Sequence, residues 1–198
     1  MNSAEIKKKE KIMKDKVQLL PIDNVDLEKL HKWHNDKEIK YPLMKFRFPI
    51  HLDSVKKWVA DIGSENKNQK AVYGVFFNGV AIGAGWLCYI DYINKKCSVG
   101  AFIGETKYHN KGIGKIVFSL LLDFAFNGLG MNKVELEVLC SNSNAIHLYK
   151  KIGFFHEGTK REAYFANGKF LDIEIMSILK KEFFLNINLA TESLVKQY

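Results

Sequence analysis

The turn KYHNKGIGK (residues 107–115) is the most informative stretch of this sequence. The apolar residues before it, CSVGAFI (residues 97–103), predict a strand. The apolar residues after it recur at helical spacing and predict an amphipathic helix that ends near glycines 128 and 130. The stretch VELEVLC (residues 134–140) predicts the next strand. This order of strand, turn, helix and strand leaves unpaired backbone amides at a helix start, where an anion such as a phosphate binds well.

The residues of the turn also suit an anion. Gly112 and Gly114 have no Cβ atom, so the backbone can approach a bound group closely, and Lys111 and Lys115 add positive charge. The pattern fits neither common nucleotide fingerprint, because a P-loop needs Ser or Thr after its Gly-Lys pair and the dinucleotide motif needs a third glycine where Val117 stands. A tight turn without a ligand remains the alternative for this motif taken alone.

The rest of the chain predicts a mixed α/β fold, with a mostly antiparallel sheet flanked by helices. Asn-Gly pairs at residues 78–79 and 167–168 separate apolar runs, which is a strong hairpin signal. Further strands are expected at residues 17–22, 71–77 and 80–90, helices at residues 23–36, 52–63 and 143–153, and a loop at residues 41–50. The expected organisation is a Lys-rich arm over residues 1–16, one domain over residues 17–181 and a C-terminal extension over residues 182–198.

The composition is typical of a globular cytoplasmic protein, with 47% hydrophobic and 26% charged residues. No apolar run reaches the roughly 18–20 residues that cross a bilayer, and the Lys-rich N-terminus lacks the apolar core of a secretory signal. Cys88, Cys97 and Cys140 are widely spaced, so neither a disulfide scaffold nor a zinc cage is predicted.

The net charge of +8 favours anionic ligands. Six lysines stand against three acidic residues in residues 1–16, so part of this charge belongs to the arm. Arginine occurs only at positions 47 and 161, and no nucleic-acid motif is present, which argues against a nucleic-acid or ribosome-binding module. That module stays open as an alternative of a different class.

A second motif stands about thirty residues beyond the turn. Asn142, Ala145, Leu148 and Tyr149 form the pattern NxxAxxLY, and Gly-Phe follows at residues 153–154. Together with the turn, this motif resembles the Gcn5-related N-acetyltransferase (GNAT) superfamily over roughly residues 17–181. His109 stands where the superfamily usually has Gln or Arg. Within the superfamily, the W-x-N-D pattern at residues 33–36 is similar to the branch of ribosomal-protein and amino-sugar acetyltransferases.

The resemblance implies the GNAT fold and direct attack of a primary amine on acetyl-CoA, with no metal. Tyr149 would protonate the leaving thiolate and Glu137 would serve as the general base, unless a water chain takes that part. The expected cofactor-binding residues are Phe102, Ile103, His109, Asn110, Lys111, Gly112, Ile113, Gly114, Lys115, Asn142, Ala145, Leu148 and Tyr149.

The acceptor is expected to be a small-molecule amine, and its predicted binding residues are Trp33, Asn35, Tyr41 and Arg47. Aromatic and basic residues in the loop at residues 41–50 favour a nucleotide-linked amino sugar, with the ring stacked and the diphosphate beside Arg47. A ribosomal-protein or peptide N-terminus and a polyamine are the alternatives, and a polyamine site would need clustered carboxylates. A homodimer stays open.

Each of these residues also has a structural interpretation. Tyr149 could be a packing aromatic only, and Glu137 alternates with apolar residues as the solvated face of a strand would. His31 and His34 share a helix face, but the sequence offers no third metal ligand near them. A CoA-sensing protein without catalysis is the remaining alternative, and the intact Tyr149 argues against it.

Overall fold

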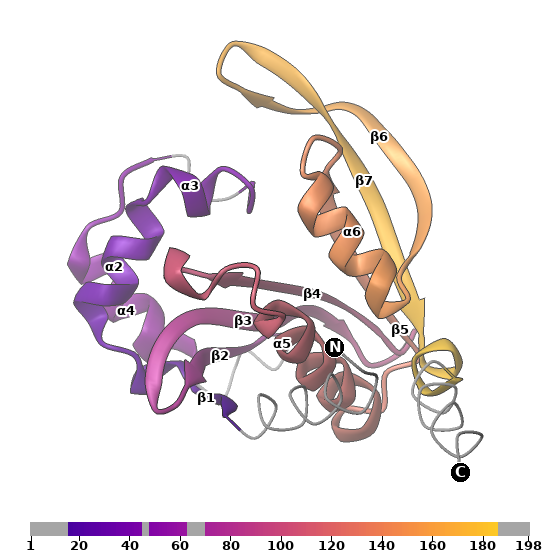
Figure 1. Cartoon of the computed structure of the whole chain (residues 1–198), viewed down its shortest axis with the longest axis horizontal. Helices are drawn as coiled ribbons and strands as arrows, with labels where there is room; N and C mark the ends of the chain where they lie inside the picture. Colours follow the sequence, from indigo (N-terminus) through magenta and orange to yellow (C-terminus); the bar gives the residue numbers. More distant parts are fainter. Residues whose placement is uncertain (1–15, 45–47, 63–69, 186–198) are drawn as a thin grey trace, which may run out of the picture.

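A seven-stranded mixed sheet forms the frame of the molecule in the computed structural model, which describes residues 16–44, 48–62 and 70–185 (Figure 1). The strand order is β1-β2-β3-β4-β5-β7-β6, and only β4 and β5 run parallel. The strands are β1 (Val17–Pro21), β2 (Lys70–Phe77), β3 (Val80–Asp91), β4 (Lys96–Ile103), β5 (Lys133–Leu139), β6 (Phe155–Ala166) and β7 (Lys169–Leu179). The predicted mixed α/β fold is confirmed.

Helices cover both faces of this sheet. One face packs against α5 and α6, and the other packs against α2 and α4 over the strands β2 and β3. The helices are η1 (Ile22–Asn24), α2 (Leu27–Asn35), α3 (Lys37–Lys40), α4 (Leu52–Ile62), η2 (Thr106–Tyr108), α5 (Ile113–Asp123), the π-helical η3 (Phe124–Gly128) and α6 (Ser143–Ile152). None of the helices in the described ranges is both long and apolar enough to span a bilayer.

Local sequence signals explain most of these boundaries. Both predicted hairpins form, with Asn78 and Gly79 at φ 51° and 76° and Asn167 and Gly168 at φ 50° and 76°. Two successive residues with positive φ match the twist of the flanking strands, which is why Asn-Gly is favoured there. The helix α6 begins where the Asn142 side chain accepts a hydrogen bond from the Ala145 amide, and it ends at a left-handed Gly153.

The sheet opens between β4 and β5. These parallel strands pair only from Lys96 opposite Lys133 to Ser98 opposite Glu135, and both strands continue beyond that point. Their carboxyl-terminal halves therefore diverge and leave a gap in the middle of the sheet (Figure 1).

Three features differ from the sequence expectation. The short helix α3 was not predicted, and the last turn of the long helix after residue 113 is the π-helical η3. Residues 180–185 are helical, and Phe183 is buried in the core against Phe126, so the folded unit extends beyond the predicted end at residue 181. The arm at residues 1–15 and residues 186–198 of the extension lie outside the described residues.

Candidate active site

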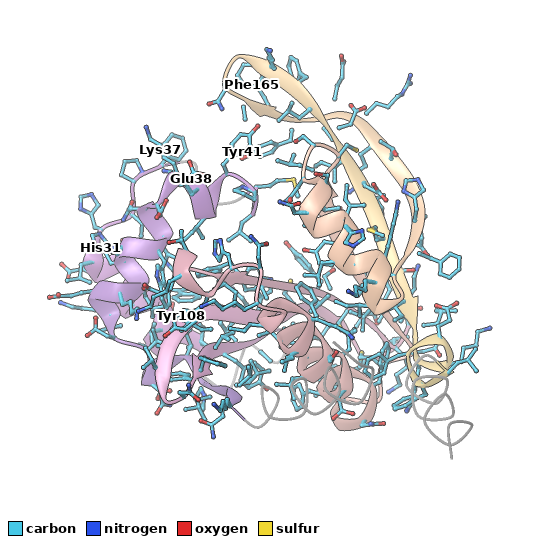
Figure 2. The ribbon with its side chains drawn as sticks, viewed as in Figure 1. His31, Lys37, Glu38, Tyr41, Tyr108 and Phe165 are labelled. Atoms are coloured by element: carbon cyan, nitrogen blue, oxygen red, sulfur yellow. The ribbon has the colours of Figure 1, made fainter. Side chains whose placement is uncertain are left out.

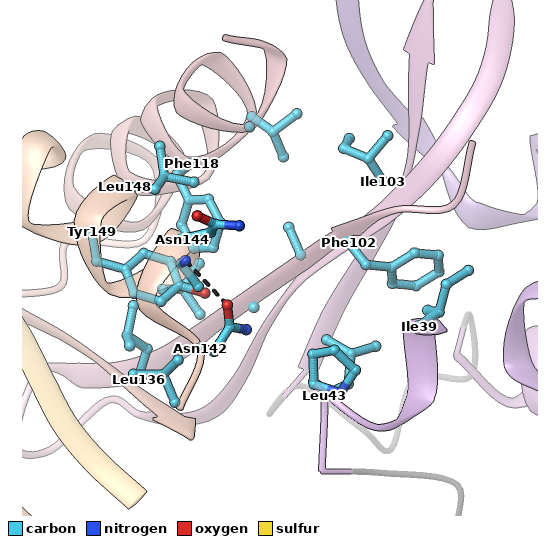
Figure 3. Close-up of a pocket in the computed structure, with 18 of the residues that line it drawn as sticks. Ile39, Leu43, Phe102, Ile103, Phe118, Leu136, Asn142, Asn144, Leu148 and Tyr149 are labelled. Carbon is cyan, nitrogen blue, oxygen red and sulfur yellow. Dashed lines mark hydrogen bonds between the residues drawn. The ribbon is translucent and has the colours of Figure 1, made fainter. Parts of the chain in front are cut away.

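A cavity of about 840 Å³ passes through the opening between β4 and β5. Its wall on one face of the sheet comes from the start of α5 and from α6; we call this the α5 side. On the opposite face it is lined by residues of the α3 segment, by residues of β3 and by Glu137; we call this the α3 side. The lining residues from the first two segments are Asp36, Glu38, Ile39, Pro42, Leu43, Met44, Trp86, Cys88 and Tyr89. Figure 3 shows Tyr149 and Asn142 on one side of the opening, with Phe102 and Ile39 across from them.

The turn before α5 is shaped by two residues in the left-handed region. Asn110 has φ 57° and Gly112, the N-cap of α5, has φ 79°. Left-handed residues within a turn direct successive amides into one concavity, which favours an anion. A Cβ atom at Gly112 would have no protein atom within 4 Å, so its backbone conformation, and not crowding, requires glycine there.

Gly114 has a different role from Gly112. A Cβ atom at Gly114 would lie 3.3 Å from Leu148 Cδ2, a tighter contact than usual. The missing side chain thus lets α6 pack closely on the start of α5, which brings the two predicted motifs together. His109 joins the turn to the sheet, because its Nε2 atom lies 2.8 Å from the Ile103 carbonyl oxygen.

Backbone groups line the opening itself. The Gly104 amide donates to the Ile82 carbonyl of β3. Along a strand, the backbone N–H and C=O groups of successive residues point alternately to the two neighbouring sides. The backbone groups of Ala101 of β4 therefore point away from β3 and into the opening. Just after β5, the Cys140 amide donates to the Asp172 carbonyl of β7. By the same alternation, the backbone groups of Glu137 point into the opening. An extended ligand could therefore hydrogen-bond to both strand edges.

Tyr149 is held in the α5 side of the cavity by aromatic packing. Its ring lies 5.1 Å from the Phe118 ring and 5.8 Å from the Phe154 ring, centroid to centroid. Burial raises the pKa of Tyr149 to about 12. No described residue hydrogen-bonds to its hydroxyl group, which can therefore serve a ligand.

Carboxylates characterise the α3 side. Asp36, Glu38 and Glu137 line the cavity there, and Lys115, on the α5 side, is the single lysine or arginine among the described lining residues. Asp36 caps α3 by accepting from the Glu38 amide at 2.9 Å. The Glu137 carboxylate forms an ion pair with the Lys160 ammonium of β6.

Three of the four predicted acceptor-binding residues do not line the cavity, and Arg47 lies outside the described residues. Trp33 is 1% exposed and packs edge-to-face on Phe102. Asn35 donates to the Ile50 carbonyl and accepts from the Ile50 amide, so it anchors the segment before α4. Trp33 and Asn35 therefore support the cavity wall and do not line the cavity, contrary to the prediction that they bind the acceptor.

Tyr41 lies outside the cavity because it packs against the β6–β7 hairpin. It joins Met44 in a cluster with Tyr164 and Ile173, and Figure 2 shows Tyr41 on the side of its turn that faces the hairpin. This contact connects the α3 segment to the hairpin across the α3 side of the cavity.

Most of the other predicted site residues line the cavity, and their binding roles stay predictions. The cavity-lining residues include Phe102, Ile103, His109, Asn110, Gly112, Ile113, Gly114, Lys115, Glu137, Asn142, Ala145, Leu148 and Tyr149. Lys111 is exposed beside them, with its ammonium 5.6 Å from the centre of the Tyr108 ring. Asp36 and Glu38 were not among the predicted site residues, although Asp36 is the last residue of the W-x-N-D pattern and Glu38 stands two residues after it.

The two histidines of α2, His31 and His34, contact other parts of the protein. His31 Nε2 lies 2.8 Å from the Ile50 carbonyl oxygen, and His34 packs on Trp58. Burial lowers the pKa of His34 to about 4, with smaller contributions from His31 and Lys70. Within the described parts of the chain, no three His, Cys, Asp or Glu side chains are placed to hold a metal ion.

Comparison with known proteins agrees with this geometry. The model of the acetyltransferase (GNAT) domain matches residues 16–155. Spermidine N(1)-acetyltransferase of Vibrio cholerae is 25% identical over 183 residues, covering 86% of this chain and 97% of that protein. The Escherichia coli K12 spermidine N(1)-acetyltransferase is 23% identical over 180 residues, covering 91% and 95% of the two chains.

A solved structure shows the same fold. The crystal structure of the Vibrio cholerae spermidine N-acetyltransferase in complex with CoA and spermine has a TM-score of 0.79, at 24% identity, and the match covers 86% of this chain and 99% of that one. The family match spans more than half of the chain and includes both motifs around the opened sheet. The chain belongs to the acetyltransferase (GNAT) domain family and is an acetyl-CoA-dependent N-acetyltransferase.

Proposed function

We propose that this enzyme acetylates a primary amine of a polyamine such as spermidine. The observation that carries the proposal is the carboxylate lining of the α3 side by Asp36, Glu38 and Glu137. A linear polycation gains from several nearby carboxylates, whereas the diphosphate of a nucleotide-linked amino sugar would be repelled by them. The similarity to spermidine acetyltransferases also favours the polyamine over the amino sugar expected from the sequence.

The α5 side would hold acetyl-CoA. The amides of residues 111–115 would bind its pyrophosphate, since they begin a helix and Gly112 leaves open space in front of them. The backbone groups of Ala101 and Glu137 would pair with the amides of the pantetheine arm inside the opening. Bound there, acetyl-CoA supplies a thioester carbonyl carbon for attack by the amine.

Glu137 and Tyr149 would move the protons of the reaction. An alkyl amine with a pKa near 10 is mostly protonated at pH 7, and deprotonation costs about 1.4 kcal/mol per pKa unit. Glu137 would accept that proton, directly or through a water molecule, as the amine nitrogen bonds to the acetyl carbon. As the carbon–sulfur bond breaks, Tyr149 would donate its phenolic proton to the sulfur, and its raised pKa keeps that proton available.

An acceptor screen tests the proposal directly. Purified enzyme would be given acetyl-CoA with spermidine, spermine, an amino-sugar nucleotide or a peptide N-terminus, and free thiol would be measured. We expect the polyamines to give the highest kcat/KM. Faster turnover of an amino-sugar nucleotide or a peptide would contradict the polyamine assignment and leave the acetyltransferase activity intact.

Charge-neutral variants test the carboxylates. Asp36→Asn combined with Glu38→Gln should raise the KM for spermidine at least severalfold and leave the KM for acetyl-CoA nearly unchanged. Asp53→Asn on α4 is the matched control, because it removes an exposed carboxylate that does not line the cavity. An unchanged spermidine KM in the double variant would show that these carboxylates do not bind the acceptor.

A further inference from the structure

The ion pair between Lys160 and Glu137 connects the edge of the sheet to the cavity. Lys160 lies on β6 opposite Ile173 of β7, whereas Glu137 lies on β5 opposite Ile175 of β7. The Lys160 side chain therefore crosses β7 diagonally to reach the Glu137 carboxylate. Glu137 lines the cavity and Lys160 does not, so an ammonium group reaches a cavity carboxylate from outside.

The chemistry of this contact is that of the proposed acceptor. Lys160 presents a primary ammonium on a flexible alkyl chain, as an end of spermidine does. Other lysine pairs lie away from this carboxylate: Lys133 joins Glu135 and Glu157. We propose that Lys160 is a built-in competitor that occupies Glu137 in the free enzyme and yields it to the ammonium of the acceptor. This inference rests on the proposed polyamine acceptor.

The exposure of the pair makes such an exchange feasible. The side chains of Lys160 and Glu137 are 49% and 46% exposed, so water solvates both groups when the pair separates. Exposed ion pairs contribute little free energy, and a released Lys160 needs no new partner in the protein. The acceptor can gain further contacts at Asp36 and Glu38, which the single ammonium of Lys160 does not make. Lys160 therefore raises the acceptor KM without blocking the site.

Removing the competing charge should strengthen acceptor binding. In Lys160→Met, we expect the KM for spermidine to fall about two- to fivefold, the range for an exposed ion pair, with the KM for acetyl-CoA unchanged. Lys160→Arg keeps a cation and should behave like wild type. Lys56→Met is the matched control: its side chain is 53% exposed and pairs with Asp53 on α4, so it removes one charge away from the cavity.

A double-variant cycle assigns the effect to the pair. The Kd of spermidine would be measured by calorimetry with saturating CoA, for wild type, Lys160→Met, Glu137→Gln and the combination. If Lys160 competes for Glu137, its replacement lowers the Kd in the wild-type background and changes nothing when Glu137 is already Gln.

The outcomes separate the inference from the function on which it rests. A spermidine KM that rises or stays unchanged in Lys160→Met would overturn the competitor role and indicate that Lys160 positions Glu137 instead. An equal change with and without Glu137 would also overturn it. If wild type acetylated no polyamine, the proposed function and this inference would both fall.

Discussion

Among single residues, Tyr149 combines packing and chemistry most clearly. The rings of Phe118 and Phe154 fix its position, and the same burial raises its pKa to about 12. A phenol in this state keeps its proton at every pH at which the enzyme is expected to work, yet it can donate to a thiolate that forms beside it.

Tyr149→Phe should lower kcat by roughly 10²- to 10⁴-fold, the usual contribution of general acid catalysis, because it removes only the hydroxyl group. The KM for acetyl-CoA should change little. Steady-state kinetics would measure both, and Tyr73→Phe is the control, since Tyr73 also packs edge-to-face on a phenylalanine and has a raised pKa but does not line the cavity. An unchanged kcat with chemistry rate-limiting would exclude Tyr149 from the mechanism.

His34 predicts a pH dependence of stability. Its folded pKa of about 4 lies below the ordinary value of 6.5, so the fold favours the neutral ring. The resulting stabilisation is complete above pH 6.5 and is lost as the pH falls toward 4. Urea unfolding of wild type should show about 2 kcal/mol more loss between pH 7 and 4.5 than unfolding of His34→Gln. Parallel losses in the two proteins would refute this assignment.

At the scale of elements, the start of α5 and the turn before it act as one unit. The turn is shaped by the left-handed conformations of Asn110 and Gly112, and Gly114 lets α6 approach the same helix. The two sequence motifs are thus also two contacting pieces of structure.

Gly112→Asp should weaken CoA binding at least tenfold, because hydrogen bonds to a charged group contribute about 1.5–3 kcal/mol and the new carboxylate repels the pyrophosphate. Gly168→Asp is a matched control, since Gly168 has φ 76° and open space around it but lies in the β6–β7 hairpin. Calorimetry would compare the Kd values for CoA. Equal affinities in a folded Gly112→Asp protein would disprove the anion cradle.

Most residues predicted for cofactor binding line the α5 side of the cavity, and this has a physical reason. Anion binding at a helix start needs glycines at fixed spacing, and such local requirements leave a readable pattern. The α3 side depends on how distant segments fold together: Asp36 and Glu38 line the same cavity as Glu137 only in the folded chain. Trp33 and Asn35 belong to the W-x-N-D motif, but their roles are structural. Trp33 is buried, and Asn35 hydrogen-bonds to the backbone of Ile50.

At the scale of the whole molecule, net charge is a poor guide to the acceptor on the proposed polyamine assignment. The chain carries +8, which suggested an anionic acceptor, yet three carboxylates line the α3 side of the cavity. Net charge describes the average field far from the surface, whereas a ligand in a cavity responds to the charges within a few ångströms. Only the folded structure shows which charges those are.

The extent of the folded unit gives a prediction at the same scale. Phe183 is 4% exposed and its ring lies 5.4 Å from the Phe126 ring, beyond the domain end expected from the sequence. Phe183→Ala should lower the free energy of unfolding by about 3–5 kcal/mol, as large-to-small core substitutions do. Leu185→Ala, at a side chain that is 58% exposed, should change it by less than about 0.5 kcal/mol. Urea denaturation would measure the free energy of unfolding of both variants. Equally small losses in the two variants would support a domain end at residue 181.

The opening between β4 and β5 has a consequence for the evolution of such enzymes. On the proposed assignment, the donor is recognised largely by backbone groups of Ala101, Glu137 and the turn, and most substitutions leave those groups in place. The acceptor meets side chains instead, such as Asp36 and Glu38, and each of these can be exchanged without disturbing the sheet. Descendants of one ancestral gene can therefore inherit the same acetyl donor while selection redirects them to new amines.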